Sequence, residues 1–214
     1  MIDILSLNFT IILEFLGTFV FAISGIRLAS GKNIDLFGAY IIGLVTAIGG
    51  GTTRDLLLDV TPFWILDPKY LIITGIALLA VIVLKEKLFK WGITLFLFDA
   101  IGLGLFTIVG ISKSLDSGLP FWVCIIMGTI TGSLGGVIRD VLINEVPLLF
   151  RKDFYALACI LGGVIYLACL KLELQDPFSE IIGILSIIVL RIIAVKYDFK
   201  LPILTSIKNP QDED

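Results

Sequence analysis

Seven apolar stretches, each about as long as a membrane is thick, constrain this chain more than any other feature of its sequence. A transmembrane helix needs about 20 mostly apolar residues. The links between the stretches are short and contain turn-forming residues such as Pro62, Pro68 and Pro177, so no soluble domain fits between them. The sequence therefore predicts an all-α polytopic membrane protein with seven transmembrane helices at about 9–29, 35–58, 70–85, 91–112, 120–143, 154–171 and 178–196.

The composition agrees with this fold class and argues against several functions. Hydrophobic residues make up 57% of the chain and charged residues 16%, with a mean hydropathy of +1.05. The net charge of −3 gives no reason to expect a nucleic-acid partner. The chain has no histidine, and its three cysteines, all inside apolar stretches, show no CxxC spacing. We therefore expect no bound metal, no cofactor and no enzymatic activity.

A six-residue motif occurs twice, near the end of two of the apolar stretches. Gly50-Gly51-Thr52-Thr53-Arg54-Asp55 is followed 85 positions later by Gly135-Gly136-Val137-Ile138-Arg139-Asp140. At this offset the chain overlays on itself without a gap from position 14 to 70, and 15 of those 57 columns are identical. Unrelated segments of this composition would match in roughly one column in ten. The sequence thus contains a duplication.

The two copies are predicted to be inverted with respect to the membrane. Each contains three spans, an odd number, so the second copy must enter the membrane from the opposite side. Inverted repeats of this kind place a permeation or binding site at their interface, near the midplane. The predicted organisation is a first repeat at 1–88, a second at 89–173, a seventh helix at 174–200 that packs outside or mediates oligomer contacts, and a cytoplasmic tail at 201–214.

Glycine clusters lie past the middle of the second and fifth spans. They comprise Gly49, Gly50 and Gly51 in one span, and Gly132, Gly135 and Gly136 in the other. Glycine costs about 1 kcal/mol relative to alanine in a helix interior, and glycine clusters are sites of kinking. We expect the two helices to be kinked and interrupted here, so that free carbonyls line a polar passage. The alternative is that the glycines allow neighbouring helices to pack closely.

Charged and hydroxyl side chains recur at matching positions of the two copies. Charges at such depths normally face a bundle interior or a water-filled cavity. A surplus of acids would favour cations. The alternatives are structural ion pairs, with pairing within one helix or between helices left open, and hydroxyls that bond their own helix. The candidate pore-lining or gating residues are Glu14, Thr52, Thr53, Arg54, Asp55, Asp99, Arg139 and Asp140.

The distribution of lysine and arginine predicts the orientation. Cytoplasmic links carry an excess of these residues. The links after the first, third and fifth spans, together with the C-terminal end, hold twelve of them, against four on the other side: Arg54, Lys69, Lys113 and Lys171. This predicts a protein of the cell (inner) membrane, surrounded by lipid, with its N-terminus outside and its C-terminus in the cytoplasm.

The doubled motif and the two three-span repeats resemble the trimeric intracellular cation (TRIC) channels, most of all their prokaryotic members. The resemblance rests on segments 49–55 and 135–140 and extends to about residue 196. It implies a homotrimer with a pore in each subunit, lined by the first, second, fourth and fifth helices. It also implies conduction of monovalent cations, chiefly potassium with some sodium. Segment 54–60 lacks the lysine-containing sequence of eukaryotic members, so lipid regulation is not expected.

Two functions follow from this interpretation. The first is a cation channel, favoured by the symmetric glycines and the acidic, hydroxyl-bearing helices. The second is a membrane transporter for glycine or a similar amino acid, because some bacterial proteins with this repeat are linked to such uptake. In that case Arg54 and Arg139 would hold a carboxylate, while Asp55 or Asp140 would hold an ammonium group.

Overall fold

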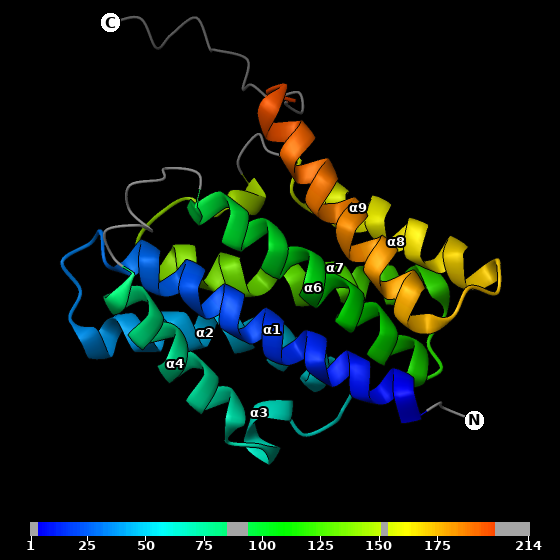
Figure 1. Ribbon diagram of the computed structural model, residues 1–214, viewed down its shortest axis with the longest axis horizontal. Coiled ribbons are helices and arrows are strands. Elements are labelled where there is room, and N and C mark those ends of the chain that lie inside the picture. The colour runs from blue at the N-terminus through cyan, green and yellow to red at the C-terminus, as the bar shows by residue number, and fades with distance from the viewer. Residues whose placement is uncertain (1–3, 85–93, 151–153, 200–214) are drawn as a thin grey trace, which may run out of the picture.

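The computed structural model describes residues 4–84, 94–150 and 154–199, and all secondary structure within them is helical. Seven helices have 15 residues or more (Figure 1): α1 (Ile4–Ala29), α2 (Leu36–Leu57), α4 (Lys69–Val83), α6 (Thr94–Asp116), α7 (Phe121–Leu142), α8 (Ala156–Lys171) and α9 (Asp176–Lys196). Two short elements join them, the one-turn helix α3 (Phe63–Leu66) and the 3-10 helix η1 (Leu148–Phe150).

Each predicted span coincides with one long helix, but several boundaries differ. Helix α6 continues four residues beyond its predicted end, to Asp116, and its predicted start at 91 lies outside the described residues. Helix α9 begins two residues early because Pro177 occupies its first turn, where the missing N–H leaves no hydrogen bond unmade. Short elements α3 and η1 were not predicted, since four or three residues are too few to show periodicity.

Five of the helices are long and apolar enough to cross a membrane, namely α1, α2, α6, α7 and α9. The apolar helices α4 and α8 have only 15 and 16 residues, fewer than the roughly 20 that a perpendicular crossing needs. Large apolar side chains point outward, such as Leu79, 62% exposed, and Leu185, 54% exposed. Water would penalise such a surface, whereas lipid does not, so the chain is a membrane protein.

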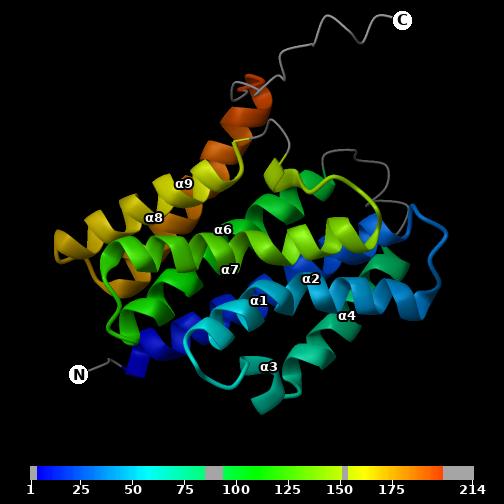
Figure 2. The same cartoon turned by 180° about the vertical axis from the view of Figure 1, so that it is seen from behind.

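Helices α1, α2, α6 and α7 form the centre of the molecule (Figures 1 and 2). Helix α4 packs against α1 and α2 on one flank, while α8 and α9 cover α6 and α7 on the other. Helices α2 and α7 cross in the middle and run in opposite directions, as Figure 2 shows. Both copies of the doubled motif therefore lie on central helices of the bundle, one on α2 and one on α7.

Matching turns end α2 and α7. Asp59 and Asn144, which lie 85 positions apart, have positive φ angles of 56° and 57°. Asparagine and aspartate tolerate this left-handed conformation better than most residues.

In the turn between α3 and α4, the backbone N–H and the ammonium group of Lys69 both bind the Asp67 carboxylate at 2.9 Å. These bonds lower the pKa of Asp67, the backbone bond most of all.

The glycines of the doubled motif let α2 and α7 touch backbone to backbone. A methyl group at Gly50 would overlap the Thr131 carbonyl, and one at Gly135 would overlap the Thr46 carbonyl. Both helices run unbroken through their glycines, so the predicted interruption with free carbonyls is wrong. Glycine keeps its own backbone hydrogen bonds, and here its missing side chain serves close packing. A bend that preserves those bonds stays a prediction.

Candidate functional site

Arg54 and Asp55 of α2 form the first of two buried charge clusters. Arg54 is fully buried, and its Nε and Nη2 lie 2.8 and 2.7 Å from Oδ1 of Asp55. The Nη2 atom also lies 3.5 Å from Oε1 of Glu14 on α1. Pairing is therefore both within one helix and between helices, which resolves the alternatives that the sequence left open.

Glu14 is the point at which four elements meet in this cluster. Its Oε1 accepts from Nζ of Lys113 at 2.6 Å, and its Oε2 accepts from the hydroxyl of Tyr70 at 3.1 Å. The Lys113 side chain is 30% exposed, whereas that of Glu14 is 2% exposed. Sequence reasoning treated Lys113 as a loop charge because it lies beyond the predicted end of its span. The continuation of α6 brings it onto Glu14 instead.

Arg139 of α7 organises the second cluster, and its bonds repeat those of the first. Its Nε donates to Oδ1 of Asp140 at 2.8 Å. Its Nη1 lies 2.8 Å from Oδ1 of Asp99 on α6 and 2.8 Å from the hydroxyl of Ser24 on α1. All three charged side chains are at most 3% exposed. Hence the second Arg-Asp pair also joins its own helix to two others.

Asp55 and Asp140 have a second, structural use. Their Oδ2 atoms accept backbone N–H bonds from Phe63 at 2.8 Å and from Leu148 at 3.0 Å. Those two residues open α3 and η1, the short elements that follow α2 and α7. Each aspartate thus neutralises its arginine and fixes the chain that leaves the helix. Neither carboxylate has an oxygen free of a protein partner.

Arg191 of α9 contributes a cation to the second cluster that sequence reasoning missed. It was counted among the cytoplasmic charges, yet its side chain is only 1% exposed and lies against the rings of Tyr155 at 4.7 Å and Phe96 at 5.3 Å. The position of Arg191 inside the last apolar stretch was the sequence signal that could have identified it as a buried charge. Several buried atoms here have no hydrogen-bond partner in the part of the chain that the structure describes: Nε and Nη1 of Arg191, Oδ2 of Asp99 and the Tyr155 hydroxyl.

Each cluster is balanced in charge. Glu14 and Asp55 face Arg54 and Lys113 in the first, and two acids face two arginines in the second, Asp99 and Asp140 with Arg139 and Arg191. The predicted acidic surplus is therefore not seen, because Lys113 and Arg191 supply the missing cations. A cavity of about 200 Å³ reaches the second cluster and is lined by Leu28, Leu95, Arg139, Asp140, Glu145 and Leu148.

The hydroxyl groups of the motif bond their own helix. Thr52 donates to the Ile48 carbonyl at 2.7 Å and Thr53 to the Gly49 carbonyl at 3.0 Å. Thr52 also accepts from the indole N–H of Trp64 at 3.0 Å. Within the described residues, no group of three or more acidic or cysteine side chains could hold a metal ion.

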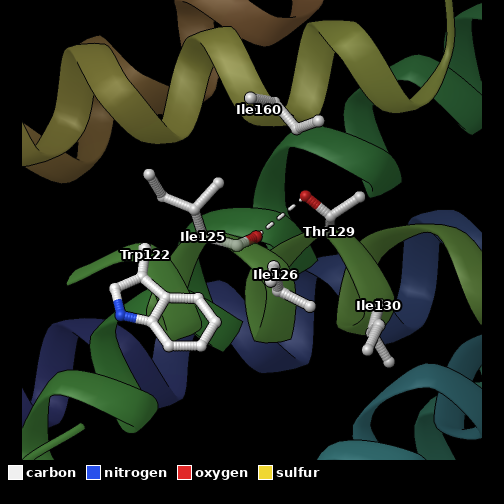
Figure 3. A pocket seen from close by; sticks show the side chains of 6 residues that line it. All are labelled: Trp122, Ile125, Ile126, Thr129, Ile130 and Ile160. Atoms are coloured by element: carbon white, nitrogen blue, oxygen red, sulfur yellow. Dashed lines mark hydrogen bonds between the residues drawn. The ribbon is translucent and has the colours of Figure 1, made fainter. Parts of the chain in front are cut away.

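A second hollow, of about 320 Å³, has no charged residue in its lining. Figure 3 shows its lining of apolar side chains from α7 and α8, among them the indole of Trp122, which is 67% exposed. The hydroxyl of Thr129, the polar side chain in this lining, donates to the Ile125 carbonyl of its own helix at 2.8 Å. The lining of this hollow is apolar and uncharged, so it provides no ligands for an ion.

A profile of the family described as glycine transporter matches this chain twice, over residues 11–86 and 96–171. The two matched segments are 85 positions apart, the offset of the doubled motif. The duplication inferred from the sequence is thereby confirmed.

Curated relatives and solved structures agree with this match. A UPF0126 membrane protein of Vibrio cholerae is 42% identical over 89% of this chain and 81% of its own. The UPF0126 inner membrane protein YadS of Escherichia coli K12 is 38% identical over 89% and 93%. A TRIC channel orthologue from Rhodobacter sphaeroides superposes with a TM-score of 0.83 at 30% identity, covering 88% of this chain and 98% of that one. A structure from a study of conductance through TRIC cation channels gives 0.81 at 36%, covering 92% and 98%.

Proposed function

This chain belongs to the UPF0126 membrane proteins, the family that the glycine-transporter profile describes, and from that premise we propose that it is a channel for monovalent cations. The observation that carries the proposal is the pair of buried, ion-paired clusters built on α2 and α7, two helices that pack against each other inside a TRIC fold. Buried charges in a membrane normally face a bundle interior or a water-filled path. The resemblance to TRIC channels supports potassium as the chief ion and a homotrimer with one pore in each subunit.

The proposal includes inverted repeats, with helices α1, α2 and α4 as one unit and α6, α7 and α8 as the other. Equivalent contacts support it: Arg54 with Asp55 and Arg139 with Asp140, then Tyr70 beside Glu14 and Tyr155 in the cluster of Asp99. The antiparallel run of α2 and α7 in Figure 2 supports it too. We place the N-terminus outside and the C-terminus in the cytoplasm, with boundaries of the repeats at 1–88 and 89–173.

Lys113 is the group whose movement would make the first cluster accessible to ions. Its ammonium group occupies Oε1 of Glu14 at 2.6 Å, where a permeating potassium ion would find its carboxylate ligand. Because the lysine side chain is 30% exposed, it is the only one of the four charged groups of this cluster with substantial access to the surface. Movement of Lys113 away from Glu14 would leave the cluster with a net negative charge, which a cation could balance. We propose that this exchange admits ions.

Conductance in planar bilayers tests the function. Purified protein should give unitary currents that reverse near the potassium equilibrium potential in a gradient of potassium chloride. Reversal near the chloride potential, or silent bilayers with protein shown to be inserted, would contradict the proposal. The trimer is checked separately by the mass of the detergent-solubilised particle.

A transporter for glycine or a similar amino acid is the second candidate, and one observation favours it. Among the described residues, two nitrogen atoms of Arg191 and one oxygen of Asp99 have no hydrogen-bond partner; Arg191 lies over the ring of Tyr155, and Asp99 interacts with Tyr155 electrostatically. A zwitterion could place its carboxylate on Arg191 and its ammonium group on Asp99. This moves the binding role away from Asp55 and Asp140, whose oxygens are already used. Saturable uptake of labelled glycine into vesicles, lost in Arg191→Gln, would establish this function.

A further inference from the structure

Glu180 on α9 is a buried acid that belongs to neither of the two charge clusters. Only 2% of the surface of Glu180 is exposed. Its Oε1 accepts from the hydroxyl of Thr10 on α1 at 3.2 Å, while its Oε2 is buried and has no hydrogen-bond partner in the described part of the chain. Among the residues that the structure describes, no lysine or arginine lies within ion-pair distance of it. A carboxylate in this state carries a large desolvation cost.

The side chains described next to Glu180 offer oxygen atoms and carry no positive charge. Thr10 comes from α1, Ser112 from α6 and Tyr166 from α8, and the Ser112 hydroxyl interacts with both Glu180 and Tyr166. Two further acids, Asp116 and Asp176, act on Glu180 electrostatically from exposed positions at the same end of the bundle. Lys171, at the end of α8, is turned to the ring of Phe121, 5.6 Å from it.

Figure 1 shows the N-terminal ends of α1 and α9 gathered with the C-terminal ends of α6 and α8. Glu180 lies just inside this end, about one turn into α9. The exposed aspartates therefore make this end of the bundle acidic, although Lys113 acts on Asp116, and the buried Glu180 carboxylate lies beneath them among hydroxyl groups. Hard monovalent cations prefer such oxygen ligands.

We propose that Glu180, with Thr10 and Ser112, binds a single positive charge, either an alkali-metal ion or a proton, at a site separate from the central clusters. The bound cation compensates the Glu180 carboxylate and occupies its free Oε2. Because the site ties α9 to α1 and α6, binding stabilises the contact between the seventh helix and the first repeat. The proposal does not depend on whether the protein conducts ions.

Stability measurements on the full-length protein in detergent distinguish the two sources of charge. In alkaline buffer containing only N-methylglucamine, replacement of that ion by sodium or potassium at constant ionic strength should raise the unfolding temperature if a metal ion binds. Infrared difference spectra over a pH titration in the same organic cation should show a protonated carboxyl band at pH values above the ordinary range of aspartate and glutamate if a proton binds to Glu180. Glu180→Gln should abolish whichever response the wild-type protein gives, and the control Glu173→Gln, an exposed acid in the α8–α9 turn, should retain it.

The proposal is overturned if both responses are absent from the wild-type protein or if they persist unchanged in Glu180→Gln. Should Glu180→Gln fail to accumulate, Thr10→Val makes the same comparison, because it removes the hydroxyl bonded to Oε1 and keeps the acid. That variant should weaken the metal-ion response or shift the proton titration. An unchanged response in Thr10→Val would contradict the site as described.

Discussion

Each of the three buried arginines that the structure describes is accompanied by more than one stabilising group. Arg139 binds two carboxylates and a hydroxyl, Arg54 binds Asp55 and lies 5.7 Å from the ring of Phe63, and Arg191 lies between two aromatic rings. The cost of removing a guanidinium group from water is high, so a single surface-type pair would not repay it. Arg54 and Arg139 were predicted from the doubled motif, whereas Arg191 was missed, and the partners that these arginines find on other helices were not predictable from the sequence.

Removal of Arg139 should be far more costly than removal of an exposed lysine with an equally short ion pair. Arg139→Ala leaves Asp99 and Asp140 buried without their cation, which should lower stability by about 3–5 kcal/mol. Lys32→Ala breaks the pair with Glu145, also short at 2.6 Å, but both side chains are about 40% exposed. That loss should be about 0–1 kcal/mol. Denaturant titration of both variants in detergent makes the comparison, and equal losses would show that Arg139 is not held as described.

Lys113→Met should increase potassium conductance. Methionine keeps the length of the side chain but frees Oε1 of Glu14 from the ammonium group at 2.6 Å. If that pair contributes about 1 kcal/mol, the current should rise roughly fivefold. Lys69→Met is the control, because Lys69 pairs with Asp67 at the surface, outside the cluster. Single-channel recording at equal protein density measures both, and a fall in current with Lys113→Met would contradict the role of Lys113 as the occupant of the cation site.

At the scale of elements, the sequence predicted the long helices well because their apolar stretches have no competing interpretation. It left two uses of the glycines open, kinking and close packing, and its expectation of interrupted helices is wrong. Glycine clusters are compatible with kinking and with close packing, and only the position of the neighbouring helix decides between them. The carbonyls of Thr131 and Thr46 lie where methyl groups at Gly50 and Gly135 would be. The short elements α3 and η1 likewise begin at residues whose N–H groups bind Asp55 and Asp140, and no local pattern reveals these bonds.

A methyl group at the crossing of α2 and α7 should push these helices apart. Gly50→Ala and Gly135→Ala each place Cβ on a backbone carbonyl, which cannot move as a flexible side chain can. Overpacking of this kind costs about 1–3 kcal/mol or more. Gly75→Ala in α4 is a matched control, since nothing lies within 4 Å of its position, and it should be neutral or stabilising by up to about 1 kcal/mol. Thermal unfolding in detergent separates these outcomes; a neutral Gly50→Ala would refute the close crossing.

At the scale of the whole molecule, orientation and inversion are linked. Three arginines that entered the count of basic residues are buried in the clusters: Arg54, Arg139 and Arg191. Their removal leaves ten basic residues on the predicted cytoplasmic side against three on the other. The bias therefore survives the correction, and the positive-inside rule still predicts an N-terminus outside.

The turns after α2 and α7 offer the sharpest test of the inverted arrangement. Asp59 and Asn144 occupy equivalent positions in the two repeats, with nearly equal φ angles, and so would lie on opposite faces of the membrane. In a background without the native cysteines Cys124, Cys159 and Cys169, Asp59→Cys should react with an impermeant maleimide added outside intact cells. Asn144→Cys should react only after the cells are opened. Labelling of both variants from the same side would exclude inverted repeats, and labelling with the sides exchanged would keep the inversion but reverse the orientation.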